Sequence, residues 1–576
     1  MNPTLVRFWQ VIKPHQRLIW IGLALLLVNA ACRLTLPFLV LTAVDDFLVP
    51  GELDGFWFLS WAYLAIAGLE TACRRWQLIA LETAGQNSLL DLRLHVFSHL
   101  QKLPARFFDR TPIGRLVGRV TTDVEALQET FSSGVVTILG DLVFLAAAVV
   151  ILLALNLQLA LTTMLMVPVL VATTMVVRGG VRRAYVVLRE RLSHLNGFLH
   201  EQVSGMPIVQ MFGQEANRVD EFAEINARVC SSQIRTVRLE STLSATVEML
   251  GSFTTALILY YGGILEIEEA IQLGTLVAFV DYMGRFFIPL NELSLKYTVM
   301  QNALVAGERI FALLDEDVEE ADPEVPTVNT GDGAIEFCDV TFGYDPESPV
   351  LKNVSFGTKA GEKVALVGAT GAGKTTILSL LTRLYELDSG QILLDGVDIR
   401  ELSRMELRRQ IGVVPQDVFL FQGTILDNVR LGQPQITDAE AILAADQLHL
   451  DEIVRRFPGG YREPIAERGK NLSAGEKQLI ALARMLVVAP RVLALDEATS
   501  NVDSHTEHLL QDAVHRLMSG RTSLIIAHRL STIKDVDRIL VMHAGELVEQ
   551  GTHDELMARR GVYWRLYQLQ YQDQEL

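Results

Sequence analysis

KVALVGATGAGKTT, residues 363–376, combines a short apolar run with a glycine-rich loop and the start of a helical pattern. The loop has the complete spacing G-x-x-x-x-G-K-[ST] between a predicted strand and a predicted helix, which is typical of a phosphate-binding loop. Its glycines let successive backbone N–H groups point at phosphates, and the helix N-terminus adds partial positive charge. The residues predicted to contact phosphates are Gly368, Ala369, Thr370, Gly371, Ala372, Gly373, Lys374, Thr375 and Thr376.

Two side chains of this loop have separate predicted tasks. Lys374 is expected to reach the β- and γ-phosphates of a nucleotide, and the Thr375 hydroxyl is expected to bind Mg²⁺. A glycine-rich turn without function is the alternative interpretation. The complete spacing and the flanking strand and helix disfavour it.

A pair of carboxylates ends another apolar run downstream. Val492–Leu495 is followed directly by Asp496 and Glu497. Phosphoryl transfer needs a Mg²⁺ ligand and a carboxylate that polarises water, and the end of a strand would present both. An Asp-Glu pair after a strand means little by itself. Combined with the phosphate-binding loop, it predicts Asp496 as a metal ligand and Glu497 as the carboxylate that polarises water.

Both motifs lie in the C-terminal half, where long apolar runs give way to short strands that alternate with helices. That alternation predicts a separate α/β domain over residues 333–576. The preceding residues 316–332 are acidic and contain proline, so we predict a linker there. Residues 1–315 form the other half of the chain, which we predict to be a transmembrane domain.

The N-terminal half contains six apolar segments long enough to cross a hydrocarbon core of ~30 Å. In the whole chain 50% of residues are hydrophobic and 20% are charged, which indicates a membrane protein. The net charge of -18 disfavours nucleic acid as a partner, because binding a polyanion needs clustered Lys and Arg. The predicted spans are Leu18–Val44, Phe56–Ala72, Gly134–Leu155, Leu159–Val177, Leu243–Leu265 and Leu273–Leu290.

Basic residues predict the orientation of these spans. The short connections at 45–55, 156–158 and 266–272 contain no Lys or Arg, whereas the long connections at 73–133 and 178–242 are rich in Arg. By the positive-inside rule, the long connections and both termini face the cytoplasm of a multi-pass protein in the cytoplasmic (inner) membrane. Both long connections keep helical spacing, so we expect helices that extend ~45 Å past the bilayer to turn regions at 104–109 and 211–215.

The sequence LSAGE, residues 472–476, lies between the two nucleotide motifs. Together the three motifs closely resemble the nucleotide-binding domain of ATP-binding cassette (ABC) proteins. The resemblance covers the whole chain, since RFFDRTPIGR at 106–115 and GMPIVQMFGQE at 205–215 look like the two coupling regions of six-helix exporters. It implies a half-transporter in which an α-helical membrane domain with long cytoplasmic extensions precedes an α/β P-loop ABC ATPase domain.

The same resemblance implies roles for further residues. Tyr344 would stack on adenine, Gln416 would sense the γ-phosphate and bind Mg²⁺, and His528 would be the switch histidine. Residues 500–503, SNVD, resemble the loop that contacts the other subunit. ATP and Mg²⁺ are the implied cofactors, and the implied enzyme activity is an ATPase coupled to transport.

The family's usual signature is LSGGQ, and this chain has Ala474 at the first glycine and Glu476 at the glutamine. In the family this signature contacts ATP held by the opposite subunit, so Ser473, Gly475 and Glu476 are candidate nucleotide-binding residues across a dimer. The change leaves this chain's own catalytic set intact and affects only the site to which the signature is donated. Residues 282–294 also look similar to the catalytically intact subunit of heterodimeric multidrug exporters. We therefore predict a different half-transporter as partner, with a homodimer as the alternative.

The implied function is ATP-driven export or flipping of a small hydrophobic or amphipathic substrate by alternating access, in a membrane-lipid environment. One alternative is an ATP-gated membrane regulator without export, which an intact Glu497 and His528 disfavour. Another is a cassette ATPase that acts on nucleic acid, which the six spans and the net charge disfavour.

Charged residues occur within or beside the predicted spans. An uncompensated charge near the bilayer centre costs at least ~2.5–3.5 kcal/mol, so Asp281, Arg285 and Glu292 should face a cavity or each other. The alternative is that Asp281 and Arg285 simply pair at i,i+4 or lie at the cytoplasmic end of the span. The environments of Arg33, Asp141 and Glu248 are left open between a buried role and the water boundary.

Overall fold

The chain divides into two compact units. Unit 1 comprises Met1–Gln101 and Ile113–Glu316, and unit 2 comprises Lys102–Pro112 and Asp317–Leu576. The short segment Lys102–Pro112, which sequence composition places in the membrane half, thus clusters with the C-terminal unit. The computed structural model describes residues 3–51, 54–133, 135–319, 322–323, 326–327, 329–345, 347–431, 433, 435–496, 504–527 and 533–570.

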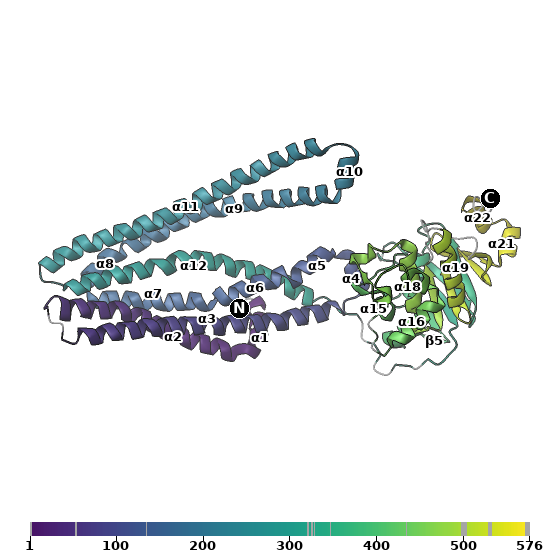
Figure 1. The fold of residues 1–576 in the computed structure, drawn as a ribbon, viewed down its shortest axis with the longest axis horizontal. Coiled ribbons are helices and arrows are strands. Elements are labelled where there is room, and N and C mark those ends of the chain that lie inside the picture. Colours follow the sequence, from purple (N-terminus) through teal and green to yellow (C-terminus); the bar gives the residue numbers. More distant parts are fainter. Residues whose placement is uncertain are drawn as a thin grey trace. The chain divides into compact units, whose positions relative to one another are not determined.

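The described part of unit 1 is built from helices (Figure 1). Six helical segments are long and apolar enough to cross a membrane, which confirms the predicted number of spans among the described residues. These segments are Val6–Leu48, Phe56–Leu100, Thr137–Leu155, Leu157–Ser204, Glu215–Ile267 and Leu273–Leu290. The helices are α1 (Pro3–Ile12), η1 (Lys13–His15), α2 (Gln16–Thr42), the π-helix η2 (Ala43–Leu48), α3 (Phe56–Leu100), α5 (Ile113–Val120), α6 (Thr122–Ser133), α7 (Val135–Leu155), α8 (Leu157–Met164), α9 (Met166–Ser204), α10 (Met206–Met211), α11 (Glu215–Ile267) and α12 (Leu273–Leu314).

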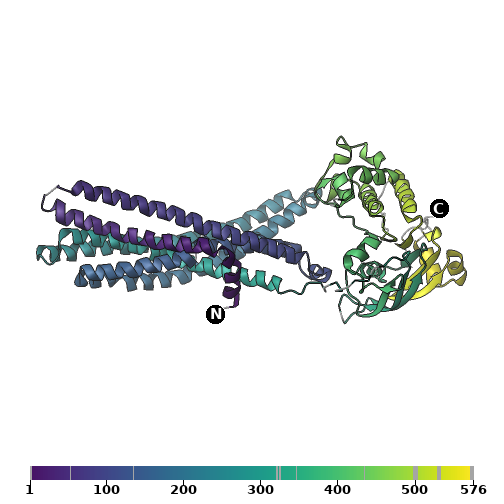
Figure 2. The same ribbon diagram turned by 90° about the horizontal axis from the view of Figure 1, so that it is seen from below.

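Several helices are far longer than a bilayer requires. Helix α3 has 45 residues and α11 has 53, and at ~1.5 Å rise per residue the shorter one already measures ~68 Å. Figures 1 and 2 show α9 and α11 running side by side along their length, with α10 joining them. The expectation that the spans continue as helices beyond the bilayer is therefore confirmed.

The first predicted turn region, 104–109, contains a short helix, and the second, 211–215, directly follows one. Pro104, with extended backbone angles, precedes α4 (Ala105–Arg110), and Pro207 stands at the second position of α10. Proline suits these positions because the first helical N–H groups have no partner within the helix. At the end of α10, the Met211 and Phe212 side chains are 74% and 69% exposed. The second turn region thus presents apolar side chains to its surroundings.

The described part of unit 2 contains two main sheets and a two-stranded one. The first sheet has the order β2-β1-β4-β5, the second β12-β11-β3-β10-β9-β6, and the third β7-β8. The strands are β1 (Ile335–Phe342), β2 (Leu351–Thr358), β3 (Lys363–Gly368), β4 (Ser389–Leu394), β5 (Val397–Asp398), β6 (Ile411–Val414), β7 (Gly423–Thr424), β8 (Pro464–Ile465), β9 (Val492–Asp496), β10 (Thr522–Ile526), β11 (Arg538–His543) and β12 (Glu546–Gly551).

The central strands β3, β10 and β9 are buried along nearly their whole length, as their continuous apolar runs require. Strand β10 pairs in parallel with β3 on one side and with β9 on the other, and helices lie between these strands in the sequence. The helices are α13 (Lys374–Leu381), α14 (Arg404–Gln410), α15 (Ile425–Arg430), α16 (Asp438–Gln447), α17 (Leu450–Val454), η3 (Gly460–Arg462), η4 (Glu467–Gly469), α18 (Ala474–Val488), α19 (Ser504–Met518), α21 (His553–Arg559) and α22 (Val562–Gln570). An α/β domain after a helical membrane domain is the predicted fold class, which is confirmed.

Two large hydrophobic clusters hold unit 2 together. One surrounds the phosphate-loop helix and includes Ala372 and Ile377, and the other includes Leu479 and Ile480 of α18. In the α18 region Arg484 is 9% exposed and donates three hydrogen bonds: Nε to the Asn428 carbonyl oxygen at 2.6 Å, Nη2 to the Asn428 Oδ1 at 2.7 Å, and Nη1 to the Phe419 carbonyl oxygen at 2.9 Å. A single buried cation therefore joins α18 to the segment around α15.

We expect Arg484→Leu to lower the thermal unfolding midpoint of unit 2 by ~5–10 °C, because loss of the guanidinium leaves buried carbonyl groups without partners. Calorimetry on the membrane-embedded chain would measure the shift. Arg455→Leu is the control, since the Arg455 side chain is 79% exposed and pairs with Asp451 in the same helical turn. That exposed pair should contribute ~0–1 kcal/mol, so equal shifts for the two variants would contradict the assignment.

Candidate functional site

The predicted nucleotide residues gather at one edge of the six-stranded sheet. Strands β3, β10, β9 and β6 run in parallel, so their carboxyl ends lie at the same edge. Gly368 ends β3, Asp496 ends β9, and Gln416 follows two residues after the end of β6. Ligands of open α/β sheets bind beyond the carboxyl ends of the strands, which is where these residues lie.

The loop from Gly368 to Gly373 is glycine-rich for steric reasons. A Cβ atom at Gly368 would lie 2.3 Å from the carbonyl oxygen of Met542 on the adjacent strand β11. Gly373 has φ +96, and a Cβ there would lie 2.5 Å from the Leu351 Cδ2. The remaining loop residues Ala369, Thr370, Gly371 and Ala372 connect these two tight points directly before α13.

Lys374 lies inside this loop. Its Nζ donates hydrogen bonds to the carbonyl oxygens of Gly368 at 2.7 Å and Ala369 at 3.0 Å, and the residue is 7% exposed. Burial lowers the pKa of the Lys374 ammonium group, and the nearby Asp496 carboxylate opposes that shift. A buried cation that is surrounded by backbone oxygens favours the binding of an anion such as a phosphate.

Thr375 and Asp496 meet as the sequence predicts. The Thr375 Oγ1 donates to the Asp496 Oδ2 at 3.0 Å, and Asp496 is 7% exposed at the end of β9. Hydroxyl and carboxylate oxygens are ligands that Mg²⁺ prefers when it also binds phosphates. The described residues therefore fit a magnesium ion held by Thr375 and Asp496, with the exposed Gln416 on the same edge.

Tyr344 lies beside the start of α13. Its hydroxyl group is 3.3 Å from the Thr376 Oγ1, and the residue is 39% exposed. Its ring makes edge-on contacts with Phe342 and Tyr385, both with centroids 5.1 Å apart. The structure thus brings Tyr344 and Thr376 together at the phosphate loop, with a partly open aromatic surface.

Helix α4 contacts this aromatic group within unit 2. The Arg106 Nη2 donates to the Tyr344 carbonyl oxygen at 2.9 Å, and the Tyr385 hydroxyl donates to the Asp109 Oδ2 at 2.7 Å. Burial, reinforced by the Asp109 carboxylate, raises the pKa of Tyr385. Sequence reasoning identified the α4 region as a coupling region but gave no signal that Tyr385 is its partner.

The signature residues have a structural task at the start of α18. Ser473 is the N-cap residue, and its Oγ accepts a hydrogen bond from the Glu476 backbone N–H at 3.2 Å. In return, the Ser473 backbone N–H donates to the Glu476 Oε2 at 2.8 Å. This reciprocal pair is a capping box, for which the spacing S-x-x-E is a sequence signal that our sequence analysis missed. Gly475 lies buried in the first turn.

Two predicted catalytic residues, Glu497 and His528, lie outside the described residues, as do residues 500–503. Their neighbours are described: Asp496 ends β9, and Ala527 follows the paired strand β10. Their roles stay predictions from the sequence.

The charges of the sixth span both pair and border a cavity. The Arg285 Nε lies 3.1 Å from the Asp281 Oδ1, so the i,i+4 alternative holds. The same two residues line a cavity of about 510 Å³ in unit 1, whose other walls are mostly apolar. The side chain of Glu292 lies outside the described part of the structure.

Other charged groups near the spans also have partners. The Lys296 Nζ lies 2.6 Å from the Asp141 Oδ2, and the two side chains are 16% and 15% exposed. The Arg33 guanidinium lies 4.4 Å from the centroid of the Phe144 ring, in a cation–π contact. Asp141 therefore has a partly buried cation as its partner, and Lys296 is a residue that the sequence analysis did not single out.

Comparison with known proteins places both halves in one family. Residues 19–290 match the family described as ABC transporter transmembrane region, and residues 351–500 match the family described as ABC transporter. The chain is similar to the ATP-dependent lipid A-core flippase of Syntrophus aciditrophicus, with 34% identity over 576 residues, 99% of this chain and 95% of the relative.

Two further relatives match at slightly higher identity. A fatty acid ABC transporter ATP-binding/permease protein of Mycobacterium tuberculosis is 38% identical over 483 residues, 84% of this chain and 76% of the relative. A probable multidrug resistance ABC transporter ATP-binding/permease protein of Bacillus subtilis is 38% identical over 493 residues, 85% of this chain and 73% of the relative.

We expect Lys374→Ala to weaken ATP binding by at least ~tenfold, because the phosphates lose a charge-assisted hydrogen-bond donor. Titration with a fluorescent ATP analogue would measure the affinity. Lys352→Ala is a matched control, since that exposed lysine lies on β2 outside the loop. Equal affinity for Lys374→Ala and the unaltered chain would refute the assignment of the phosphate site.

Proposed function

This chain belongs to the ABC transporter family, and we propose that it is one half of a dimeric exporter that uses ATP to move a hydrophobic or amphipathic substrate across a membrane. The family domains make the chain an ATPase coupled to transport. The observation that carries the proposal is the Thr375–Asp496 contact beside the phosphate loop, in a chain whose described residues also include six helical segments long and apolar enough to cross a membrane.

The proposed chemistry distributes the work of ATP hydrolysis over this loop and its edge. Thr375, Asp496 and Gln416 would hold Mg²⁺, which supplies positive charge to the phosphates. Lys374 neutralises charge that develops on the transferred phosphoryl group, Glu497 polarises the attacking water, and His528 stabilises the γ-phosphate. Tyr344 provides an aromatic surface for adenine.

A second half-transporter completes the site in this proposal. Ser473, Gly475 and Glu476 would contact ATP bound by the opposite subunit, and two such contacts close the ATPase domains on each other. The exposed Met211 and Phe212 at the end of α10 support a partner, because large apolar side chains at a helix tip are a suitable contact surface. ATP can drive the switch only by binding the closed dimer more tightly than the open one.

The membrane half suggests the class of substrate. The cavity lined by Asp281, Arg285 and apolar residues suits a molecule with an apolar body and a polar end. The names of these relatives refer to fatty acid, to lipid A-core and to multidrug resistance, which supports amphipathic or hydrophobic cargo for this chain too. We further propose that both termini are cytoplasmic in the inner membrane, from the positive-inside pattern.

An ATP-gated regulator without export is the competing function. Reconstituted vesicles would separate the two: ATP should drive movement of a lipophilic dye or a fluorescent phospholipid in the exporter. A broad panel of such compounds would be tested. If none of them stimulates ATP hydrolysis and none is moved across the membrane, the result would favour the regulator.

We expect Glu497→Gln to keep ATP binding while hydrolysis falls by at least ~tenfold, because only the carboxylate that polarises water is lost. Phosphate release and nucleotide retention would be measured on the assembled transporter. Glu546→Gln, on the exposed face of β12, is the control with unchanged turnover. Near-normal turnover in Glu497→Gln would show that another group activates the water.

The heterodimer can be tested by expressing this chain with and without a second half-transporter. The altered signature should make a homodimer a poor ATPase, and a partner with a standard signature should restore activity. Native mass spectrometry gives the assembly, and phosphate release gives the activity. A stable homodimer with full activity would disprove the heterodimer.

A further inference from the structure

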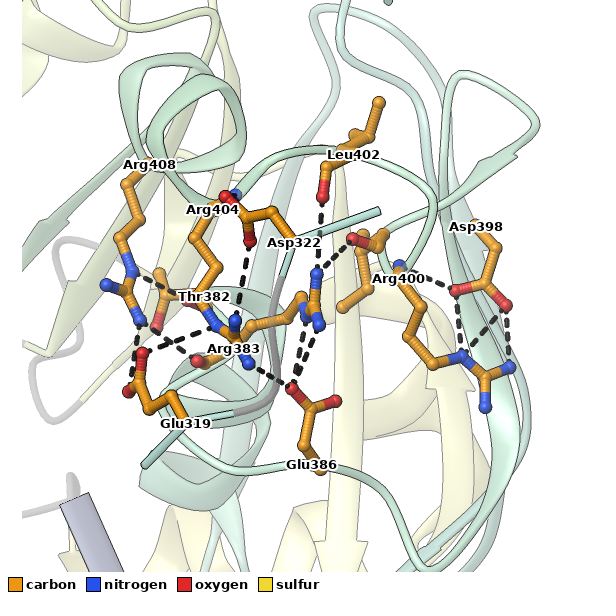
Figure 3. A network of polar contacts seen from close by, with 11 residues as sticks. Glu319, Asp322, Thr382, Arg383, Glu386, Asp398, Arg400, Leu402, Arg404 and Arg408 are labelled. Atoms are coloured by element: carbon orange, nitrogen blue, oxygen red, sulfur yellow. Dashed lines mark hydrogen bonds and ion pairs between the residues drawn. The ribbon is translucent and has the colours of Figure 1, made fainter. Parts of the chain in front are cut away.

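The chain that leaves α12 is held tightly where it enters unit 2. After α12 the chain continues into an acidic segment that includes Glu319 and Asp322. Both carboxylates are engaged by α14, a helix that sequence analysis did not connect with the linker (Figure 3).

Arg404, the first residue of α14, is the centre of these contacts. Its Nε lies 3.5 Å from the Glu319 Oε2, its Nη1 lies 3.4 Å from the Asp322 Oδ1, and its backbone N–H donates to both Asp322 carboxylate oxygens at 3.2 Å. Its Nη2 donates to the Glu386 Oε1 at 2.9 Å. The Arg404 side chain is 11% exposed, so water screens these contacts weakly.

Arg408, one turn later in α14, extends the contacts to the phosphate-loop helix. Its Nη2 lies 4.0 Å from the Glu319 Oε1. The same guanidinium donates to the carbonyl oxygens that follow α13: Nε to Thr382 at 3.3 Å and Nη2 to Arg383 at 3.0 Å (Figure 3). Arg408 therefore contacts the linker and the carboxyl end of the helix whose amino end forms the phosphate site.

The segment that begins at Lys102 also contacts the linker at Glu319. The Glu319 backbone N–H donates to the Lys102 carbonyl oxygen at 2.9 Å, and Lys102 is the first residue of the segment that carries α4 into unit 2. Lys102 and Glu319, both of unit 2, are therefore joined at the residue that Arg404 and Arg408 bind.

We propose that Glu319, Asp322, Arg404 and Arg408 form a linker clamp within unit 2, in which Arg404 is a positioning residue that holds the linker against the segment around the P-loop helix α13. The inference rests on the proposed function, because it assigns the clamp to the coupling between ATP and the membrane half. It concerns residues outside the nucleotide site: none of the four belongs to the phosphate loop, the metal ligands or the signature.

The physical argument is one of rigidity. Two arginines of α14, of which Arg404 is largely buried, hold two carboxylates of the linker, and breaking one partner of such a network leaves the others poorly compensated. Helix α13 has only 8 residues, about 12 Å of rigid helix. A displacement of the linker is therefore passed to the phosphate end of α13 rather than absorbed by a loose chain.

The first arm of the test measures the clamp without ATP. In Arg404→Gln, in the membrane-embedded transporter, the amides around Glu319 should exchange with deuterium roughly tenfold faster, the effect expected when a charge-assisted contact is lost. Unchanged protection of those amides would overturn the clamp, whatever the function of the protein.

The second arm measures coupling. Mg-ATP should alter deuterium exchange in the α9, α11 and α12 peptides of the unaltered transporter. In Arg404→Gln this ATP-dependent change should drop to about half or less, with ATP affinity unchanged. If the unaltered transporter shows no ATP-dependent change, the proposed function fails while the first arm still decides the clamp. A full ATP-dependent change in Arg404→Gln would overturn the coupling role.

Matched variants separate positioning from general damage. Glu319→Gln and Asp322→Asn alter the more exposed side of the clamp. If Arg404→Gln folds poorly, these two variants replace it in the test, and they should show the same loss of amide protection and of the ATP-dependent exchange change. The double variant of Arg404→Gln with Glu319→Gln should lose no more of the ATP-dependent exchange change than Arg404→Gln alone, since the two residues act together. Arg404→Lys should restore part of the effect. Arg400→Gln, which breaks a pair with Asp398 that does not touch the linker, should leave both arms unchanged.

Discussion

A backbone N–H or C=O group inside a bilayer has no water to bind, so each span must close its hydrogen bonds within its own helix. This constraint decides unit 1. The described spans are helical, with an interruption at Leu165 between α8 and α9, and even Pro37 and Pro289 lie inside helices rather than ending them. The hydrocarbon of the bilayer also provides no partner for a charged side chain. Asp141 accordingly pairs with Lys296, and Asp281 pairs with Arg285.

Sequence alone predicted the six spans, the α/β unit and the phosphate loop because each depends on local pattern. A run of apolar residues specifies a span wherever its neighbours lie, and Gly368 and Gly373 are required by steric limits within a few ångströms of the loop. The meeting of Thr375 with Asp496 was also predictable, since parallel strands present their carboxyl ends at one edge.

Long-range partners were not predictable in this way. Nothing in the local sequence tells that Asp109 contacts Tyr385, or that Lys102–Pro112 clusters with unit 2 instead of unit 1. From the sequence, Arg404 is an ordinary polar residue at the start of a helix. Its importance in the fold comes from acidic residues 18 to 85 positions away, including Glu386 and Glu319. Such contacts form only when separate elements pack, so composition and spacing carry no trace of them.

The capping box of α18 has an evolutionary consequence. Either glutamate or glutamine completes the box at its third helical position, and alanine at the first position favours a helix over glycine by up to about 1 kcal/mol. Each replacement needs one base change in a codon. A lineage can therefore move from the common signature to the one in this chain by steps that leave the folded helix intact, and selection at Ala474 and Glu476 then acts through the ligand alone.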